Sequence, residues 1–202
     1  MKKIANFIGF GIALALVCGC AQQTPKVAAS TAAIPDAAAV TRPKGYVLVR
    51  EYVDSVKTDH GDEYQKVQYG WDYDQGLAVQ RISNMDGKLI SAQAEPDLTL
   101  ETTPNELEYA FALVRLQPEL SAIAKRPDAR IYGGFSLKTD PRDVSNTPAN
   151  AACGAKSRCI HVIISGGLTG EESLAHAIVN LASGLVVDAN YRGEQAVVSK
   201  IK

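Results

Sequence analysis

The sequence predicts an α+β domain in which a curved antiparallel sheet packs on one main helix. Apolar and polar residues alternate in several short segments that are separated by glycine-containing turns, as expected of half-buried strands. One later segment carries a helix-capping sequence followed by apolar residues at helical spacing. Strand-like segments precede and follow this helix, which favours an α+β arrangement.

The first half of the domain predicts antiparallel strands. Val67, Tyr69, Trp71 and Tyr73 alternate with polar or small residues, which is a period of two. These aromatic side chains belong to the core if a helix covers them, or they form an exposed stripe that binds glycan or peptide. The strands that we expect here, with turns at 74–76 and 84–87, are 46–56, 67–73, 77–83 and 88–94.

The main helix begins after Thr103. Pro104 suits the first helical position, and Glu106 can reach back to the backbone amide of Thr103 in a capping box. The Gln117-Pro118 step predicts a kink or a restart of the helix. The apolar positions that share one helical face are Leu107, Ala110, Phe111 and Val114.

Strands return after the helix, at 130–137, 158–165, 174–181 and 185–191. Between the first two of them lies a polar loop at 138–157, whose length is typical of a functional or disordered segment. Residues 195–202 add an edge strand or fray. Segments 77–92 and 174–189 align without gaps and match their turn glycines, Gly87 and Gly184. The alignment suggests two related β units, with possible sub-units 46–95 and 96–192.

The N-terminal segment predicts export and lipidation. Lys2 and Lys3 precede an uncharged apolar run of signal-peptide length, and Val17 and Gly19 stand before Cys20 at the positions of a bacterial lipobox, which this segment resembles. The resemblance implies a signal peptide at 1–19, and acylation of Cys20 by chains such as palmitate. Residues 20–45 lack aromatic side chains and predict a flexible linker, followed by a periplasmic domain at 46–202.

Charge and cysteine content agree with the cell envelope. Removal of Lys2 and Lys3 with the signal leaves a net charge of about −3, so no basic excess exists to bind nucleic acid. Ala21 follows the lipidated cysteine, which favours the periplasmic face of the outer membrane of a Gram-negative cell. Cys153 and Cys159 predict a disulfide in that oxidising compartment.

Two histidines suggest a metal site as an alternative. If the turn between their strands centres near residues 168–169, His161 and His176 lie opposite each other on one face of the sheet. With Cys159 nearby, they could bind copper or zinc. The competing interpretation is an exposed or hydrogen-bonded pair, and a shift of one residue would separate the two rings. No other metal or cofactor is expected.

Segments 97–100, 109–115 and 177–188 carry a resemblance to the cystatin-like N-terminal domains of copper-dependent amine oxidases, and more loosely to PepSY modules. The resemblance covers about half of the mature chain. It implies a helix packed across a curved antiparallel sheet, without catalytic chemistry. The catalytic domain of those oxidases, with its quinone-forming tyrosine and copper-binding histidines, has no counterpart in this sequence.

We therefore expect a membrane-anchored periplasmic lipoprotein with a non-catalytic binding or scaffolding role, and no enzymatic activity. Its lipid anchor contacts the membrane, and its partner is an envelope protein or a glycan. The expected contact surfaces are the sheet edges and the loop at 138–157. The alternatives are a copper-binding accessory protein related to amine oxidases, and a protease-inhibitor-like module suggested by the cystatin-like shape alone.

Overall fold

The computed structural model describes residues 40–138 and 147–192 of the chain. Several expectations lie outside the described residues: the signal peptide 1–19, the lipidated Cys20, most of the linker, part of the loop 138–157, and the final segment 195–202. All of the described elements belong to one compact unit, Ile34–Lys202.

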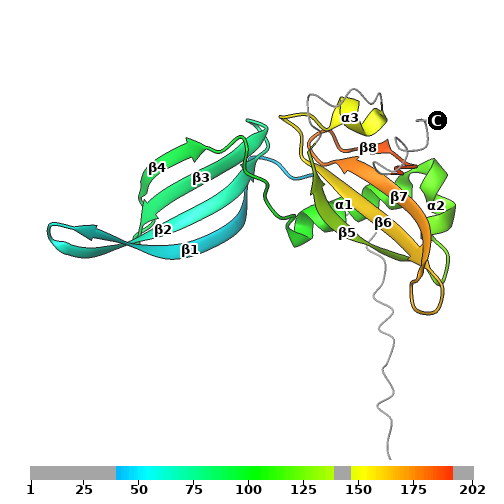
Figure 1. The fold of residues 1–202 in the computed structure, drawn as a ribbon, viewed down its shortest axis with the longest axis horizontal. Helices are drawn as coiled ribbons and strands as arrows, with labels where there is room; N and C mark the ends of the chain where they lie inside the picture. The colour runs from blue at the N-terminus through cyan, green and yellow to red at the C-terminus, as the bar shows by residue number, and fades with distance from the viewer. Residues whose placement is uncertain (1–39, 139–146, 193–202) are drawn as a thin grey trace, which may run out of the picture. The chain divides into compact units, whose positions relative to one another are not determined.

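The first sheet contains four antiparallel strands in the order β1-β2-β3-β4 (Figure 1). Their bounds are Tyr46–Thr58 for β1, Gly61–Asp72 for β2, Leu77–Asn84 for β3 and Leu89–Ala94 for β4. The far part of the β1–β2 hairpin pairs only with itself, because β3 joins β2 from Gln65 onward. No helix belongs to this part of the chain between residues 46 and 94.

The second sheet also contains four antiparallel strands, in the order β5-β6-β7-β8. Three helices accompany it. In chain order, the bounds are Pro104–Leu116 for α1, Pro118–Ala124 for α2, Arg130–Leu137 for β5, Pro148–Ala152 for α3, Cys159–Gly166 for β6, Glu172–Asn180 for β7 and Leu185–Asp188 for β8 (Figure 1).

The predicted α+β class is confirmed, but the chain forms two four-stranded antiparallel sheets instead of one. The strands of the first sheet lie within the possible sub-unit 46–95, and those of the second lie within 96–192. The prediction of a loop throughout 138–157 is also wrong, because α3 lies within it. Thr147 caps this short helix by accepting a hydrogen bond from the backbone amide of Asn150 (3.1 Å). Pro148 at the first helical position also favours a helix start. The surrounding segment is polar and the helix is short, so no apolar pattern reveals this helix in the sequence.

The main core lies between the second sheet and the helices α1 and α2. Alternate residues of β6 point into it, including Ile160, Val162 and Ile164, all of which are fully buried. Ala110 and Val114 supply the helical side, so the predicted apolar face of α1 is confirmed. The opposite face of the sheet is covered at one end by α3, in a small cluster with Cys159 and Ile178.

The two helix starts form as the sequence predicts. Thr103 accepts a hydrogen bond from the amide of Glu106 (3.3 Å), and the carboxylate of Glu106 accepts one from the amide of Thr103 (2.8 Å). This capping box is confirmed. Helix α1 ends at Leu116 and α2 restarts at Pro118, because proline cannot continue the hydrogen-bond ladder.

The matched segments 77–92 and 174–189 cover the hairpins β3–β4 and β7–β8, which are the last two strands of their respective sheets. The local geometry of the β7–β8 turn, however, is that of the β2–β3 turn, since each is a four-residue connection that follows Asp72 or Asn180. In both turns the aspartate or asparagine Oδ1 accepts from the amide three residues ahead (3.0 and 3.1 Å). Gly76 and Gly184 close the turns with φ of 70° and 73°. Gly87, which the alignment matched to Gly184, belongs to a different turn.

Candidate functional site

His161 and His176 lie on the neighbouring strands β6 and β7. Both project from the face of the second sheet opposite α1, since the alternate residues Ile160 and Ala177 point into the α1 core. The prediction that they pair directly is wrong: His161 pairs with Ile178, two residues from His176. A shift of two residues keeps a side chain on the same face, so the histidines become diagonal neighbours.

The two imidazoles and a serine form a chain of close polar contacts. His161 Nε2 lies 2.9 Å from His176 Nδ1, and His176 Nε2 lies 2.7 Å from the hydroxyl of Ser173. The histidine rings are nearly parallel, with centroids 5.0 Å apart. Tyr191 contacts His161 edge to face, at a centroid distance of 5.3 Å. Side chains from β6, from β7 and from the segment that follows β8 therefore meet in one cluster.

Burial lowers the pKa of the His161 imidazole, and the charge of His176 lowers it further. The neutral ring of His161 is consequently favoured at neutral pH. A neutral imidazole has one donor and one acceptor nitrogen. Both contacts are therefore satisfied when His161 Nε2–H donates to Nδ1 of His176, and His176 Nε2–H donates to the hydroxyl oxygen of Ser173.

Cys159 does not contribute a thiolate to this cluster. It forms a disulfide with Cys153, with the two Cα atoms 5.7 Å apart, so the predicted bridge is confirmed. The bridge attaches the end of α3 to the start of β6. A metal site that uses Cys159 with the histidines is therefore ruled out while the disulfide is intact.

The sheet face around the histidines is partly open. Phe135, which pairs with His161 across the β5–β6 ladder, is 65% exposed, and Tyr132 is 47% exposed. At the other end of the face, α3 covers Ile178 and Cys159. The histidine pair thus lies between the covered and the open part of the sheet, within reach of solvent.

The side chains of the predicted aromatic stripe pack against one small core cluster, and each makes further contacts of its own. Trp71 packs with Leu98 and Leu100 in a small core cluster. Tyr69 stacks on Tyr52 and holds the guanidinium of Arg50 over its ring at 4.8 Å. Tyr73 leaves the sheet at the end of β2 and donates a hydrogen bond to Glu106. The stripe is therefore no continuous platform for a ligand.

A buried ion pair at the start of α1 is a feature that sequence reasoning missed. Glu106 and Arg158 form two hydrogen bonds of 3.1 Å each, and their side chains are 1% and 3% exposed. Arg158 also donates to the carbonyl of Leu100 (2.8 Å), and its guanidinium lies 5.4 Å from the centre of the Trp71 ring. Tyr73 completes the network from the other side of Glu106. We call Tyr73, Glu106 and Arg158 the buried network.

The electrostatics of the buried network favour an ionised carboxylate. Burial disfavours the charge of Glu106, but the hydrogen bonds and charge of Arg158 outweigh it, and the pKa of Glu106 stays below its ordinary value. Burial and the adjacent Glu106 raise the pKa of Tyr73, which keeps its hydroxyl protonated as a donor. All three side chains are engaged with one another, so the network holds the fold.

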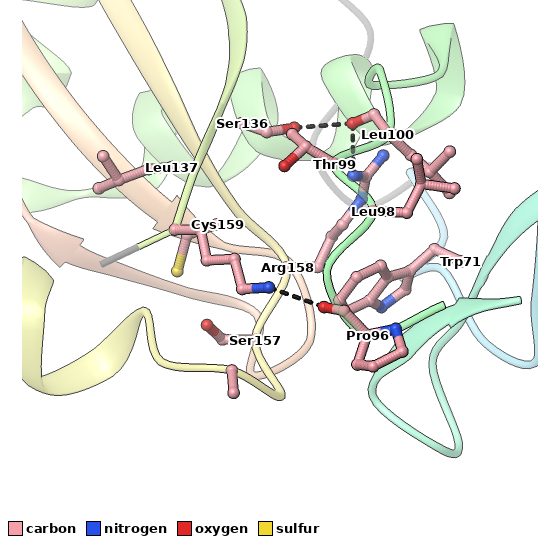
Figure 2. Close-up of a pocket in the computed structure, with 12 residues that line it drawn as sticks. Trp71, Pro96, Leu98, Thr99, Leu100, Ser136, Leu137, Ser157, Arg158 and Cys159 are labelled. Carbon is pink, nitrogen blue, oxygen red and sulfur yellow. Dashed lines mark hydrogen bonds between the residues drawn. The ribbon is translucent and has the colours of Figure 1, made fainter. Parts of the chain in front are cut away.

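A small cavity lies beside the buried network, between Trp71, Leu98 and Arg158 (Figure 2). Its volume is about 30 Å³, which is enough for one or two water molecules and too small for a larger ligand. Among the described residues, the buried Nε1 of Trp71 has no hydrogen-bond partner. A water in this cavity would be a suitable acceptor for it.

Strand β4 forms an open edge of the first sheet. All six of its residues are exposed, and Leu89 and Ile90 are each 56% exposed. The strand contains no charged residue, proline or glycine. Those are the residues that commonly protect a sheet edge from pairing with another chain.

Within the described ranges, no helix is long and apolar enough to cross a membrane, and no three histidine, cysteine or acidic residues are grouped as metal ligands. The chain matches no protein-family model and no curated protein.

Proposed function

We propose that this chain is a lipid-anchored envelope protein with a non-catalytic role, whose folded part binds a protein partner by strand addition at β4. Acylated Cys20 would hold the chain on the periplasmic face of the outer membrane, and the linker 20–45 would separate the domain from the lipid surface. The exposed, uncharged edge of β4 is the observation that carries the binding role.

Strand addition fits the chemistry of this edge. An edge strand presents unpaired backbone N–H and C=O groups, and an extended partner segment can hydrogen-bond to them. The exposed side chains of Leu89 and Ile90 add apolar contact area on either side of such a segment. Lys88 and Glu95 flank β4 at its two ends, so polar residues border the uncharged strand.

A protein partner is favoured over a glycan. Sugar rings bind on open aromatic faces, but Tyr69 is already stacked with Tyr52 and Arg50, and its hydroxyl accepts a hydrogen bond from Gln80. Trp71 is only 7% exposed. Tyr69 and Trp71 are thus engaged within the chain, whereas the backbone of β4 offers contacts to another polypeptide.

The test is photo-crosslinking in cells that make the full-length chain with a photoreactive amino acid in place of Ser91. We expect one reproducible protein adduct. The substitution Ile90→Lys adds a charge to the open edge and should reduce that adduct by roughly tenfold or more, because a charged edge opposes strand pairing. Leu185→Lys is the matched control, since Leu185 lies on the edge strand β8 and is 60% exposed.

The proposal fails if no protein adduct forms at position 91, or if Ile90→Lys and Leu185→Lys leave the same yield. Thermal unfolding of both variants shows whether either substitution disturbs the fold. Both side chains are exposed, so we expect unchanged melting temperatures.

A further inference from the structure

We propose that His161 and His176 bind a Cu(II) ion as a two-imidazole site, in which Ser173 orients His176. This site goes beyond the proposed binding function, because it lies on the second sheet and involves no residue of β4. It is built from side chains on neighbouring strands of one sheet.

The separation of the two nitrogens allows them to bind one metal ion together. Imidazole nitrogens bind first-row metals at about 2.0–2.1 Å. Two such ligands at a right angle are about 2.9 Å apart, whereas tetrahedral ligands are about 3.4 Å apart. The observed distance between His161 Nε2 and His176 Nδ1 is 2.9 Å. This distance is also that of a hydrogen bond, so the choice of metal rests on ligand type: among divalent first-row ions, Cu(II) is generally bound most tightly at nitrogen sites.

Ser173 fixes the tautomer that metal binding requires. When the Nε2–H of His176 donates to the Ser173 hydroxyl, the lone pair of His176 Nδ1 faces His161. The remaining step is a proton shift on His161 from Nε2 to Nδ1, which leaves both rings neutral with their lone pairs on the metal side.

The sheet holds the two rings close to the required positions before the metal binds. His161 and His176 are placed by the paired backbones of β6 and β7, and His161 is further confined by the edge contact with Tyr191. Ser173 is exposed, which leaves a path for the ion from solvent. Two protein nitrogens and solvent ligands predict a moderate affinity.

The experiment is a Cu(II) titration of the full-length, untagged protein in detergent with the disulfide intact. We expect one Cu(II) per chain, and pulsed electron paramagnetic resonance that shows two coordinated imidazoles. His161→Gln and His176→Gln should each weaken binding by roughly tenfold or more, and Ser173→Ala by about tenfold. His60→Gln is the matched control, because His60 is the third histidine of the chain and lies at the exposed β1–β2 turn.

The inference is overturned if no saturable site tighter than about 100 µM exists, if the resonance shows fewer than two imidazoles, or if His60→Gln weakens binding as much as the other two variants. Resonance on the unaltered protein counts the ligands directly, so the test does not depend on variants that fold. Strand addition at β4 is measured separately, and either result can fail without the other.

Discussion

At the residue scale, the buried network joins segments that lie far apart in the sequence. Glu106 serves two groups at once, because its carboxylate accepts from the amide of Thr103 and binds the guanidinium of Arg158. The capping contact spans three residues and could be predicted from the sequence. Arg158 and Tyr73 are 52 and 33 residues away from Glu106, so no local pattern connects them.

Substitution of Arg158 by methionine should destabilise the protein strongly. The change leaves the Glu106 carboxylate buried without its cation, which typically costs about 3–5 kcal/mol. Urea denaturation followed by Trp71 fluorescence measures the free energy of unfolding. Arg126→Met is the control, since Arg126 forms an exposed ion pair with Asp128 and its loss should change stability little. Equal effects of the two substitutions would contradict a structural role for the network.

The lowered pKa of Glu106 predicts how stability depends on pH. The pKa of the Glu106 carboxyl is lower in the folded chain than in the unfolded chain. The carboxylate therefore stabilises the fold at any pH at which the group is ionised in both states. The contribution is complete above about pH 4.3, the ordinary pKa, and is lost as pH falls through the folded pKa. Urea denaturation between about pH 7 and pH 3 should show this loss, and Glu106→Gln should show a smaller one. A steeper loss in Glu106→Gln would contradict the assignment.

At the element scale, local chemistry predicted most of the strands and helices. The alternation in β2, the capping box of α1 and the proline that starts α2 act within a few residues. The two helices begin where they were expected, whereas β2 begins at Gly61, six residues before the predicted strand 67–73. The strand register was harder to predict. A bulge between Ile164 and Ser165 shifts the β6–β7 pairing, which places His161 and His176 diagonally. Bulges depend on the whole sheet, so the turn position alone could not locate them.

The alternation within the strands did not show the division into two sheets, which only the match between 77–92 and 174–189 suggested. A strand that pairs in one sheet has the same alternation as a strand that pairs in another, because the period reports only which face is buried. The helix α3 was hidden for a similar reason, since five residues are too few for a helical period to show. The disulfide, by contrast, followed from the cysteine count and the predicted oxidising compartment.

At the scale of the whole molecule, the structure joins two β units of different character. The second sheet has a helix-covered core, while the first has an open edge and exposed apolar side chains on a long hairpin. A sheet with this much exposed apolar surface suits contact with a partner. An anchor at Cys20 would keep that surface in the envelope and concentrate it near membrane-associated proteins.

The central claim is that the chain works as a lipid-anchored ectodomain. Intact-protein mass spectrometry of the chain isolated from its native membranes tests it most directly. We predict a polypeptide that begins at Cys20 and carries three acyl chains. A product that retains Met1, or one whose residue 20 bears no lipid, would contradict the account.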